Sequence, residues 1–172
     1  VGRTVSVTDS TVVDFQKNGI DFRGAGLTGV ATGNTATGWG PTPAIAQNGI
    51  LWVSGAGGSA SGNTVSGFQY TGAAPATSAG LLVFATSAPV VIASNVITDA
   101  QSSIAVASST DVTASDNTIT GTGGVLAALD VQSGGVLVAN NNVISGATYG
   151  AAVVAGASLT LTGGSITGSG VG

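Results

Sequence analysis

The sequence predicts an all-β solenoid, and three observations lead to this fold class. One short polar phrase, x-Asn-x-apolar-Ser/Thr-Gly, recurs along the chain, as in ASGNTVSG at residues 60–67 and ASDNTITG at residues 114–121. The segments between the copies alternate apolar and small residues, and no longer stretch shows a helical period. Internal repetition with strand-like alternation is typical of a chain that coils into stacked turns.

The spacing of the phrase gives the size of one turn. Its Asn position falls, in order, at Ser10, Asn34, Asn63, Asn95, Asn117, Asn142 and Gly164. The spacings are 24, 29, 32, 22, 25 and 22 residues, so a fixed coil of 22 residues carries loops of variable length. One strand precedes each Asn, the phrase supplies a second, and a third follows, as in NGILWV at residues 48–53. Three short strands per rung predict a right-handed parallel β-helix of about six to seven rungs, built as one domain over residues 1–172.

A structural ladder of asparagines is expected at one turn of each rung, formed by Asn34, Asn63, Asn95, Asn117 and Asn142. Equivalent residues of stacked rungs lie about 4.8 Å apart, so each side-chain amide can donate to one neighbour and accept from the other. Asn tolerates a left-handed backbone, and we expect the ladder residues to adopt it. The aliphatic residue two positions later should point into the core, and the flanking Thr and Ser outward.

These phrases resemble those of the parallel β-helix repeat superfamily, which includes pectate lyases, polygalacturonases, phage tailspikes and many secreted or surface proteins. The resemblance extends over residues 5–168. It implies the fold for essentially the whole chain. Because the superfamily includes lyases, hydrolases, isomerases and purely structural solenoids, the resemblance does not select one activity.

Composition argues against several classes of partner. The only cations are Arg3, Lys17 and Arg23, and with seven aspartates the net charge is −4, so we expect no nucleic-acid partner. The apolar runs are far shorter than the roughly 20 residues of a membrane-spanning helix. The chain has no Cys, and only 6% of its residues are charged. A surface of Ser, Thr, Asn and Gly suits a secreted protein, and we expect an extracellular or cell-surface location.

The aspartates do not form a catalytic pair in the predicted register. Enzymes of the superfamily that cleave acidic polysaccharides use clustered carboxylates, basic residues and often calcium. Here the carboxylates that share a column are three or four rungs apart, namely Asp9 with Asp116, Asp14 with Asp99, and Asp21 with Asp130. The closest group, Asp99, Asp111 and Asp116, is spread over about 16 Å of extended chain. Without His, the abundant Ser and Thr have no base to activate them. We therefore predict no catalytic residue, no metal site and no cofactor, although enzymatic activity stays open as an alternative.

Two insertions, at residues 39–48 and 68–79, fall at the same corner of consecutive rungs. The aromatic residues Trp39, Phe68 and Tyr70 stand at their base, where they would form either a stacking platform for a sugar ring or a small core under the loops. The outward Thr and Ser columns also resemble the flat faces of ice-binding solenoids, a less favoured interpretation because valines interrupt them. Several aliphatic residues are expected to face outward on the third strand and suggest a covered patch: Leu51, Val53, Leu82, Phe84 and Val153.

The predicted β-helix has no residues left at either end to form a cap. The first strand starts by Thr4 and the last phrase ends at Gly168, so either the chain is a segment of a longer solenoid or its ends stack on each other. We expect the second: a non-enzymatic, extracellular structural solenoid that forms a head-to-tail homopolymer, as a fibre or surface assembly. A carbohydrate-binding or polysaccharide-degrading β-helix that uses the aromatic loops is the alternative, and ice binding is a third.

Overall fold

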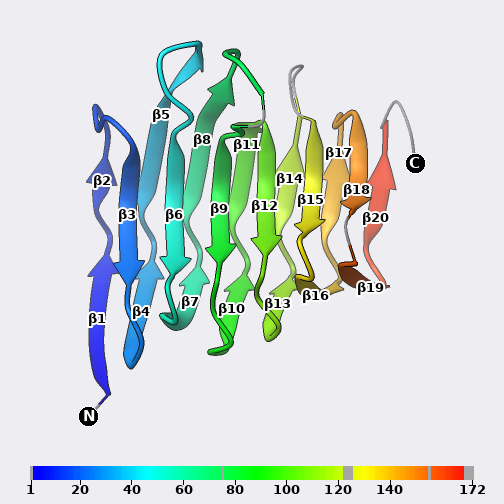
Figure 1. The fold of residues 1–172 in the computed structure, drawn as a ribbon. Helices are drawn as coiled ribbons and strands as arrows, with labels where there is room; N and C mark the ends of the chain where they lie inside the picture. The colour runs from blue at the N-terminus through cyan, green and yellow to red at the C-terminus, as the bar shows by residue number, and fades with distance from the viewer. Residues whose placement is uncertain (1, 75, 122–125, 155, 169–172) are drawn as a thin grey trace.

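The computed structural model describes residues 2–74, 76–121, 126–154 and 156–168, and these residues form a parallel β-solenoid (Figure 1). Within them, twenty β-strands follow one another around the coil, in the repeating order sheet A, sheet B, sheet C. The first and last strands, β1 and β20, lie at opposite poles of the solenoid (Figure 1). We call three successive strands a rung, so that rung 1 is β1, β2 and β3. The predicted fold class is confirmed.

The strands of the three sheets have the following bounds. Sheet A contains β1 (Arg3–Thr8), β4 (Leu27–Thr32), β7 (Gly57–Ser61), β10 (Val90–Ala93), β13 (Val112–Ser115), β16 (Val136–Asn140) and β19 (Ser158–Thr162). Sheet B contains β2 (Thr11–Val12), β5 (Thr35–Thr42), β8 (Thr64–Tyr70), β11 (Val96–Ala100), β14 (Thr118–Thr120), β17 (Val143–Ser145) and β20 (Ser165–Thr167). Sheet C contains β3 (Asn18–Arg23), β6 (Asn48–Val53), β9 (Ala79–Phe84), β12 (Ser102–Ala107), β15 (Ala127–Gln132) and β18 (Tyr149–Val153).

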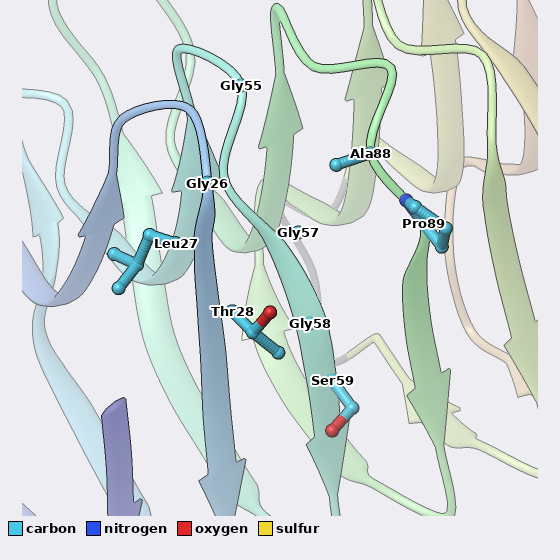
Figure 2. A pocket seen from close by; sticks show the side chains of 9 residues that line it. All are labelled: Gly26, Leu27, Thr28, Gly55, Gly57, Gly58, Ser59, Ala88 and Pro89. Atoms are coloured by element: carbon cyan, nitrogen blue, oxygen red, sulfur yellow. The ribbon is translucent and has the colours of Figure 1, made fainter. Parts of the chain in front are cut away.

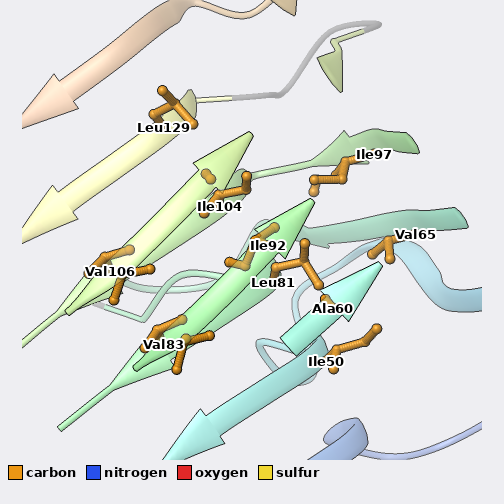
Figure 3. Packing of buried hydrophobic residues seen from close by; sticks show 14 of the residues in the cluster. Ile50, Ala60, Val65, Leu81, Val83, Ile92, Ile97, Ile104, Val106 and Leu129 are labelled. Carbon is orange, nitrogen blue, oxygen red and sulfur yellow. The ribbon is translucent and has the colours of Figure 1, made fainter. Parts of the chain in front are cut away.

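The core consists of columns of inward side chains, each column taking one residue from every rung (Figure 3). The column predicted for sheet B is in register: Val12, Ala36, Val65, Ile97, Ile119, Ile144 and Ile166. Sheet C supplies a facing column: Ile20, Ile50, Leu81, Ile104, Leu129 and Ala151. In rungs 2 to 5 these side chains are fully buried, and each Val, Leu or Ile among them contributes about 1.5–3 kcal/mol to stability.

In the first rungs, large inward residues of sheet C pack against glycines of sheet A. In rungs 1 and 2, sheet C supplies Phe22 and Trp52, whose rings lie 5.5 Å apart between centroids. Sheet A has Gly29 and Gly58 in its matching inward column, where later rungs have Val or Leu. A Cβ at Gly29 would overlap the Phe22 ring, and the Trp52 indole N–H donates to the Gly29 carbonyl at 3.0 Å. Glycine is therefore required here for space.

The asparagine ladder closes the corner between sheets A and B. Each Nδ2 donates to the Oδ1 of the next ladder residue, and all four of these distances, from Asn34 through to Asn142, are 2.9 Å. The same Oδ1 also accepts the backbone N–H of the preceding ladder Asn. All five side chains are buried, so the hydrogen bonds replace those that the amides would make to water. The predicted ladder is confirmed.

One detail of the predicted corner is wrong. The left-handed backbone belongs to the residue before each ladder position, not to the ladder Asn. This column consists of Asp9, Gly33, Gly62, Ser94, Asp116, Asn141 and Gly163, with φ between 47° and 66°. A left-handed residue followed by an extended one turns the chain sharply and aims the ladder amide along the axis. The phrase therefore begins with Gly, Asp, Ser or Asn, because that position needs a residue that tolerates a left-handed backbone.

A second, shorter amide ladder was not predicted. Asn48 Nδ2 donates to Asn18 Oδ1 at 3.0 Å, and Asn48 Oδ1 accepts the N–H of Ala79 at 3.2 Å. These residues open sheet C in rungs 1 and 2. The repeated phrase NGI at residues 18–20 and 48–50 was the signal that could have revealed it.

One expectation about the outward side chains of sheet C needs correction. Val153 pairs with Val131, which is fully buried, so it belongs to an inward column and not to the outer face. Leu51 and Val53 do lie in outward columns, but both are buried, in agreement with a covered patch. Phe84, in the column of Val53, is 45% exposed. The outward columns of sheet B have the predicted register, interrupted at Val96 and Val143.

Removing one ladder amide should destabilise the solenoid. In Asn117→Ala, the N–H of Asn95 loses its Oδ1 acceptor, the Nδ2 of Asn95 loses one of its acceptors, and the carbonyl of Ile92 loses the Nδ2 donor. Unpaired buried groups cost about 1–3 kcal/mol each, so we expect the free energy of unfolding to fall by at least about 2 kcal/mol in urea titrations followed by circular dichroism. The exposed neighbour variant Thr118→Ala is the control and should change stability by less than about 0.5 kcal/mol. Equal stability of the two variants would contradict a structural role for the ladder.

Candidate functional site

The aromatic corner does not form a single platform. Strands β5 and β8 continue into the predicted insertions, pairing Gly40 with Phe68 and Thr42 with Tyr70. Phe68 is fully buried in the main core and stacks on Phe15, with ring centroids 6.0 Å apart. Tyr70 is half-buried, and Trp39 is 49% exposed. Of the three predicted residues, Trp39 therefore offers the most accessible ring to a ligand.

Two glutamines that the sequence did not single out fix the loops of this corner. Gln47 is buried; its Oε1 accepts the N–H of Trp39 at 2.8 Å, and its Nε2 donates to the Phe15 carbonyl at 2.6 Å. Gln101 takes the equivalent place two rungs later, before β12, and its Oε1 accepts the N–H of Ser78 at 2.9 Å. Gln47 joins rungs 1 and 2 because its side-chain amide donates and accepts at once, and Gln101 of rung 4 accepts from rung 3. No repeat marks them, since they lie in segments of variable length.

Lys17 makes a further contact to the same corner. Its ammonium group donates a hydrogen bond to the Ala46 carbonyl, just before Gln47. Partial burial lowers the pKa of the Lys17 ammonium from its usual value. The contact holds residues 43–47 against rung 1.

Asp21 and Asp130 share an outward column of sheet C, as predicted, but their environments differ. Asp21 forms an ion pair with Arg23 at 2.9 Å on the surface. Asp130 is 3% exposed and accepts hydrogen bonds from Ser102 Oγ at 2.8 Å and from Gln132 Nε2 at 2.7 and 2.8 Å. A cavity of about 90 Å³ adjoins it, lined by Thr77, Leu82, Ala105, Val106, Ala107, Asp130 and Gln132. Both carboxylate oxygens of Asp130 accept hydrogen bonds, and the bond from Ser102 links β15 to β12 within sheet C.

Ionisable side chains are sparse elsewhere in the described part of the chain. Within residues 2–74, 76–121, 126–154 and 156–168, no three His, Cys, Asp or Glu side chains come together as a metal site would require. No helix long and apolar enough to cross a membrane occurs among the same residues.

A shallow groove lies at the corner between sheets C and A, along the turns that lead into rungs 2, 3 and 4 (Figure 2). It has a volume of about 460 Å³ and is lined by Gly26, Leu27, Thr28, Gly55, Gly57, Gly58, Ser59, Ala88 and Pro89. A Cβ at Gly57 would collide with the Ala88 Cβ and the Pro89 carbonyl, which both line the groove. The Thr28 and Ser59 side chains are its polar groups (Figure 2).

At the two poles, apolar side chains are exposed whose equivalents in the inner rungs are buried. At the N-terminal pole an open cavity of about 500 Å³ is lined mainly by apolar side chains, among them Val5, Val12 and Phe22. At the C-terminal pole, Leu161 is 49% and Ile166 41% exposed, beside a cavity of about 130 Å³. Among the described residues, no strand pairs with the outer edge of β1, β2 or β3, nor with that of β18, β19 or β20. The poles thus combine free backbone hydrogen-bonding groups with apolar side chains.

The poles also differ in charge. All three cations lie in the first 23 residues, whereas residues 131–168 contain no charged side chain. The described side chains of the C-terminal pole therefore carry no charge.

Comparison with known proteins identifies the family to which the fold belongs. A family model described as "Right handed beta helix region" matches residues 2–166. Neither the curated proteins nor the solved structures contain a significant match. The match extends over every rung, and it agrees with the right-handed coil predicted from the sequence. It concerns the scaffold and carries no specific activity.

Gln47 should control the order of the aromatic corner. In Gln47→Ala the Trp39 N–H and the Phe15 carbonyl lose their partner, so hydrogen exchange measured by mass spectrometry should speed up at least about tenfold across residues 39–47. Gln16→Ala, an exposed neighbour that accepts from Gln47 only through its backbone, is the matched control. Unchanged exchange in Gln47→Ala would show that the corner is held by other contacts.

Proposed function

Because the chain belongs to the right-handed β-helix family, whose shared scaffold serves unrelated activities, we propose that it is a structural solenoid that assembles end to end through its two poles. The observation that carries the proposal is the exposure, at both poles of the described structure, of unpaired strands together with apolar core residues. We also propose that the assembly is extracellular, in keeping with the absence of Cys and the low charge.

Stacking of two copies in phase would continue the existing columns. With β1 of one copy on β19 of another, Val5 lies over Leu159 and Val7 over Leu161, because these residues occupy the same two columns of sheet A. Pairing of β2 with β20 places Val12 over Ile166. Each contact buries an apolar side chain and pairs free backbone groups. Such a head-to-tail contact repeats without limit, which produces a fibre.

Pole substitutions test this assembly. We expect the wild-type protein to form assemblies whose size in light scattering increases with protein concentration. Electron microscopy should show these assemblies as rods. Leu161→Asp should stop this growth at one pole and Val5→Asp at the other, because both residues face the stacking surface. Val138→Asp, on the lateral face of sheet A and 36% exposed, is the matched control and should assemble as wild type does.

A mixture of the two pole variants gives a second readout. Each variant keeps one intact pole, so an equimolar mixture should form dimers and no longer species. A wild-type chain that stays monomeric at every concentration would refute the proposal.

Carbohydrate binding is the second candidate, and the exposed ring of Trp39 on a backbone fixed by Gln47 favours it. Stacking of an aromatic side chain on a sugar needs such a rigid, accessible ring. If this function holds, a glycan array should show ligands whose binding falls at least about tenfold in Trp39→Ala. Val143→Ala, with the same exposed fraction on sheet B, is the control. Product release from the bound polysaccharide would extend the function to degradation, whereas an array without ligands would eliminate both.

A further inference from the structure

The backbone of β5 forms a bulge at Trp39. Its pairing with β8 shifts register between Thr37 and Gly40. Beyond the bulge, Gly40 pairs with the fully buried Phe68, so this position faces the core. The neighbouring Trp39 therefore points away from the core, which agrees with its exposed fraction of 49%. Bulges that re-aim one side chain in this way are frequent next to active sites.

Close backbone contacts hold the bulge in place. A Cβ at Gly38 would collide with the carbonyl of Gly67, so the two strands approach each other more closely than side chains would allow. Gly40 and Gly67 have φ angles of 77° and 76°, a conformation that favours glycine. The N–H of Trp39 is bound by Gln47. The indole is thus presented to solvent from a fixed backbone.

The part of the chain that carries this indole contains no charge. Residues 24–98 include rungs 2 and 3 and strand β10 of rung 4, and they contain no Asp, Glu, Lys, Arg or His. Both insertions belong to this stretch. Pro41 and its partner Gln69, the next residues along the β5–β8 pair, are neutral as well. The surroundings of the indole in rungs 2 and 3 are therefore electrically neutral.

Along sheet B, the charged residues of the neighbouring rungs are anions. Asp14 follows β2 in rung 1, and Asp99 belongs to β11, the strand of rung 4 that pairs with β8. Of the three cations, Arg3 begins β1 and Arg23 ends β3, at the corner between sheets A and C. Lys17 lies near the insertions, but its ammonium group donates to a backbone carbonyl of the first insertion. An anionic ligand at the indole would therefore meet more negative than positive charge.

We propose that the glycan bound at Trp39 is a neutral polysaccharide, and that this corner excludes polysaccharides made of uronic acids. The inference rests on the carbohydrate-binding function proposed above. A uronate carboxylate at the indole loses part of its hydration and finds no cation in exchange, which costs free energy. The net charge of −4 adds long-range repulsion. A neutral sugar has no such cost, because its ring stacks on the indole and its hydroxyl groups bond to neutral partners.

Matched polysaccharides test the inference. The probes are a glucan, a mannan and a galactan, each in its neutral form and as the uronan that carries a carboxylate at C6 of every sugar. We expect at least one neutral form to bind the wild-type protein in isothermal titration calorimetry, and the uronan of the same sugar to bind at least about tenfold more weakly. The affinity for the neutral form should change by less than about twofold between about 0.01 and 0.15 M NaCl, because no ion pair is screened.

A cation placed beside the indole should weaken the exclusion. Pro41 is exposed and lies two residues from Trp39 in the sequence. Pro41→Lys should therefore strengthen uronan binding at least about threefold at about 0.01 M salt, and this gain should decline as salt is added. Pro41→Gln is the matched neutral control and should leave both affinities within about twofold of wild type.

The inference and the function on which it rests fail in different ways. Absence of binding to every neutral and acidic probe would overturn carbohydrate binding and the inference with it. Equal or tighter binding of the uronan would overturn only the inference. Neutral binding that survives in Trp39→Ala, or uronan binding unchanged in Pro41→Lys, would also overturn it, because the ligand would then lie away from the indole.

Discussion

Parallel backbone pairing between rungs is the constraint on which the rest of the structure depends. It fixes the separation of equivalent residues at about 4.8 Å, so a residue type that suits one rung is placed against its own copy in the next. Asparagine benefits because its amide both donates and accepts, and the corner from Asn34 to Asn142 becomes a continuous chain of hydrogen bonds. Aliphatic residues benefit because their columns fill the interior without a helix or a second layer.

This constraint explains what the sequence could and could not reveal. The ladder, the Ile97 column and the outward Thr and Ser were predictable because each repeats once per rung. The burial of Gln47 and Asp130 was not, since it depends on segments that differ between rungs. For the same reason the sequence left Phe68 open between a stacking platform and a core position. The same holds for the left-handed residue before each ladder Asn: the repeat marks the corner, but only backbone geometry tells which of its two residues turns the chain.

The two ends of the solenoid differ more than a simple repeat suggests. Rung 1 is complete, and Ile20 and Phe22 remain buried there although no rung precedes them in the described structure. At the other end, the ladder stops at Asn142 because Gly164 has no side-chain amide. The described side chains there are uncharged, and the apolar Leu161 and Ile166 are exposed among them. A repeat protein gains stability from contacts with adjacent repeats, so the first and last rungs have the fewest stabilising neighbours.

Both tryptophans of the chain belong to rung 2, one on β5 and one on β6. Trp52 is sealed in the core and Trp39 is half exposed, so the blue-shifted part of the intrinsic fluorescence originates from Trp52. Emission spectroscopy consequently reports on the N-terminal third of the solenoid and is blind to fraying that begins at rungs 6 and 7. A denaturation curve recorded by fluorescence and one recorded by far-ultraviolet dichroism follow different portions of the same molecule.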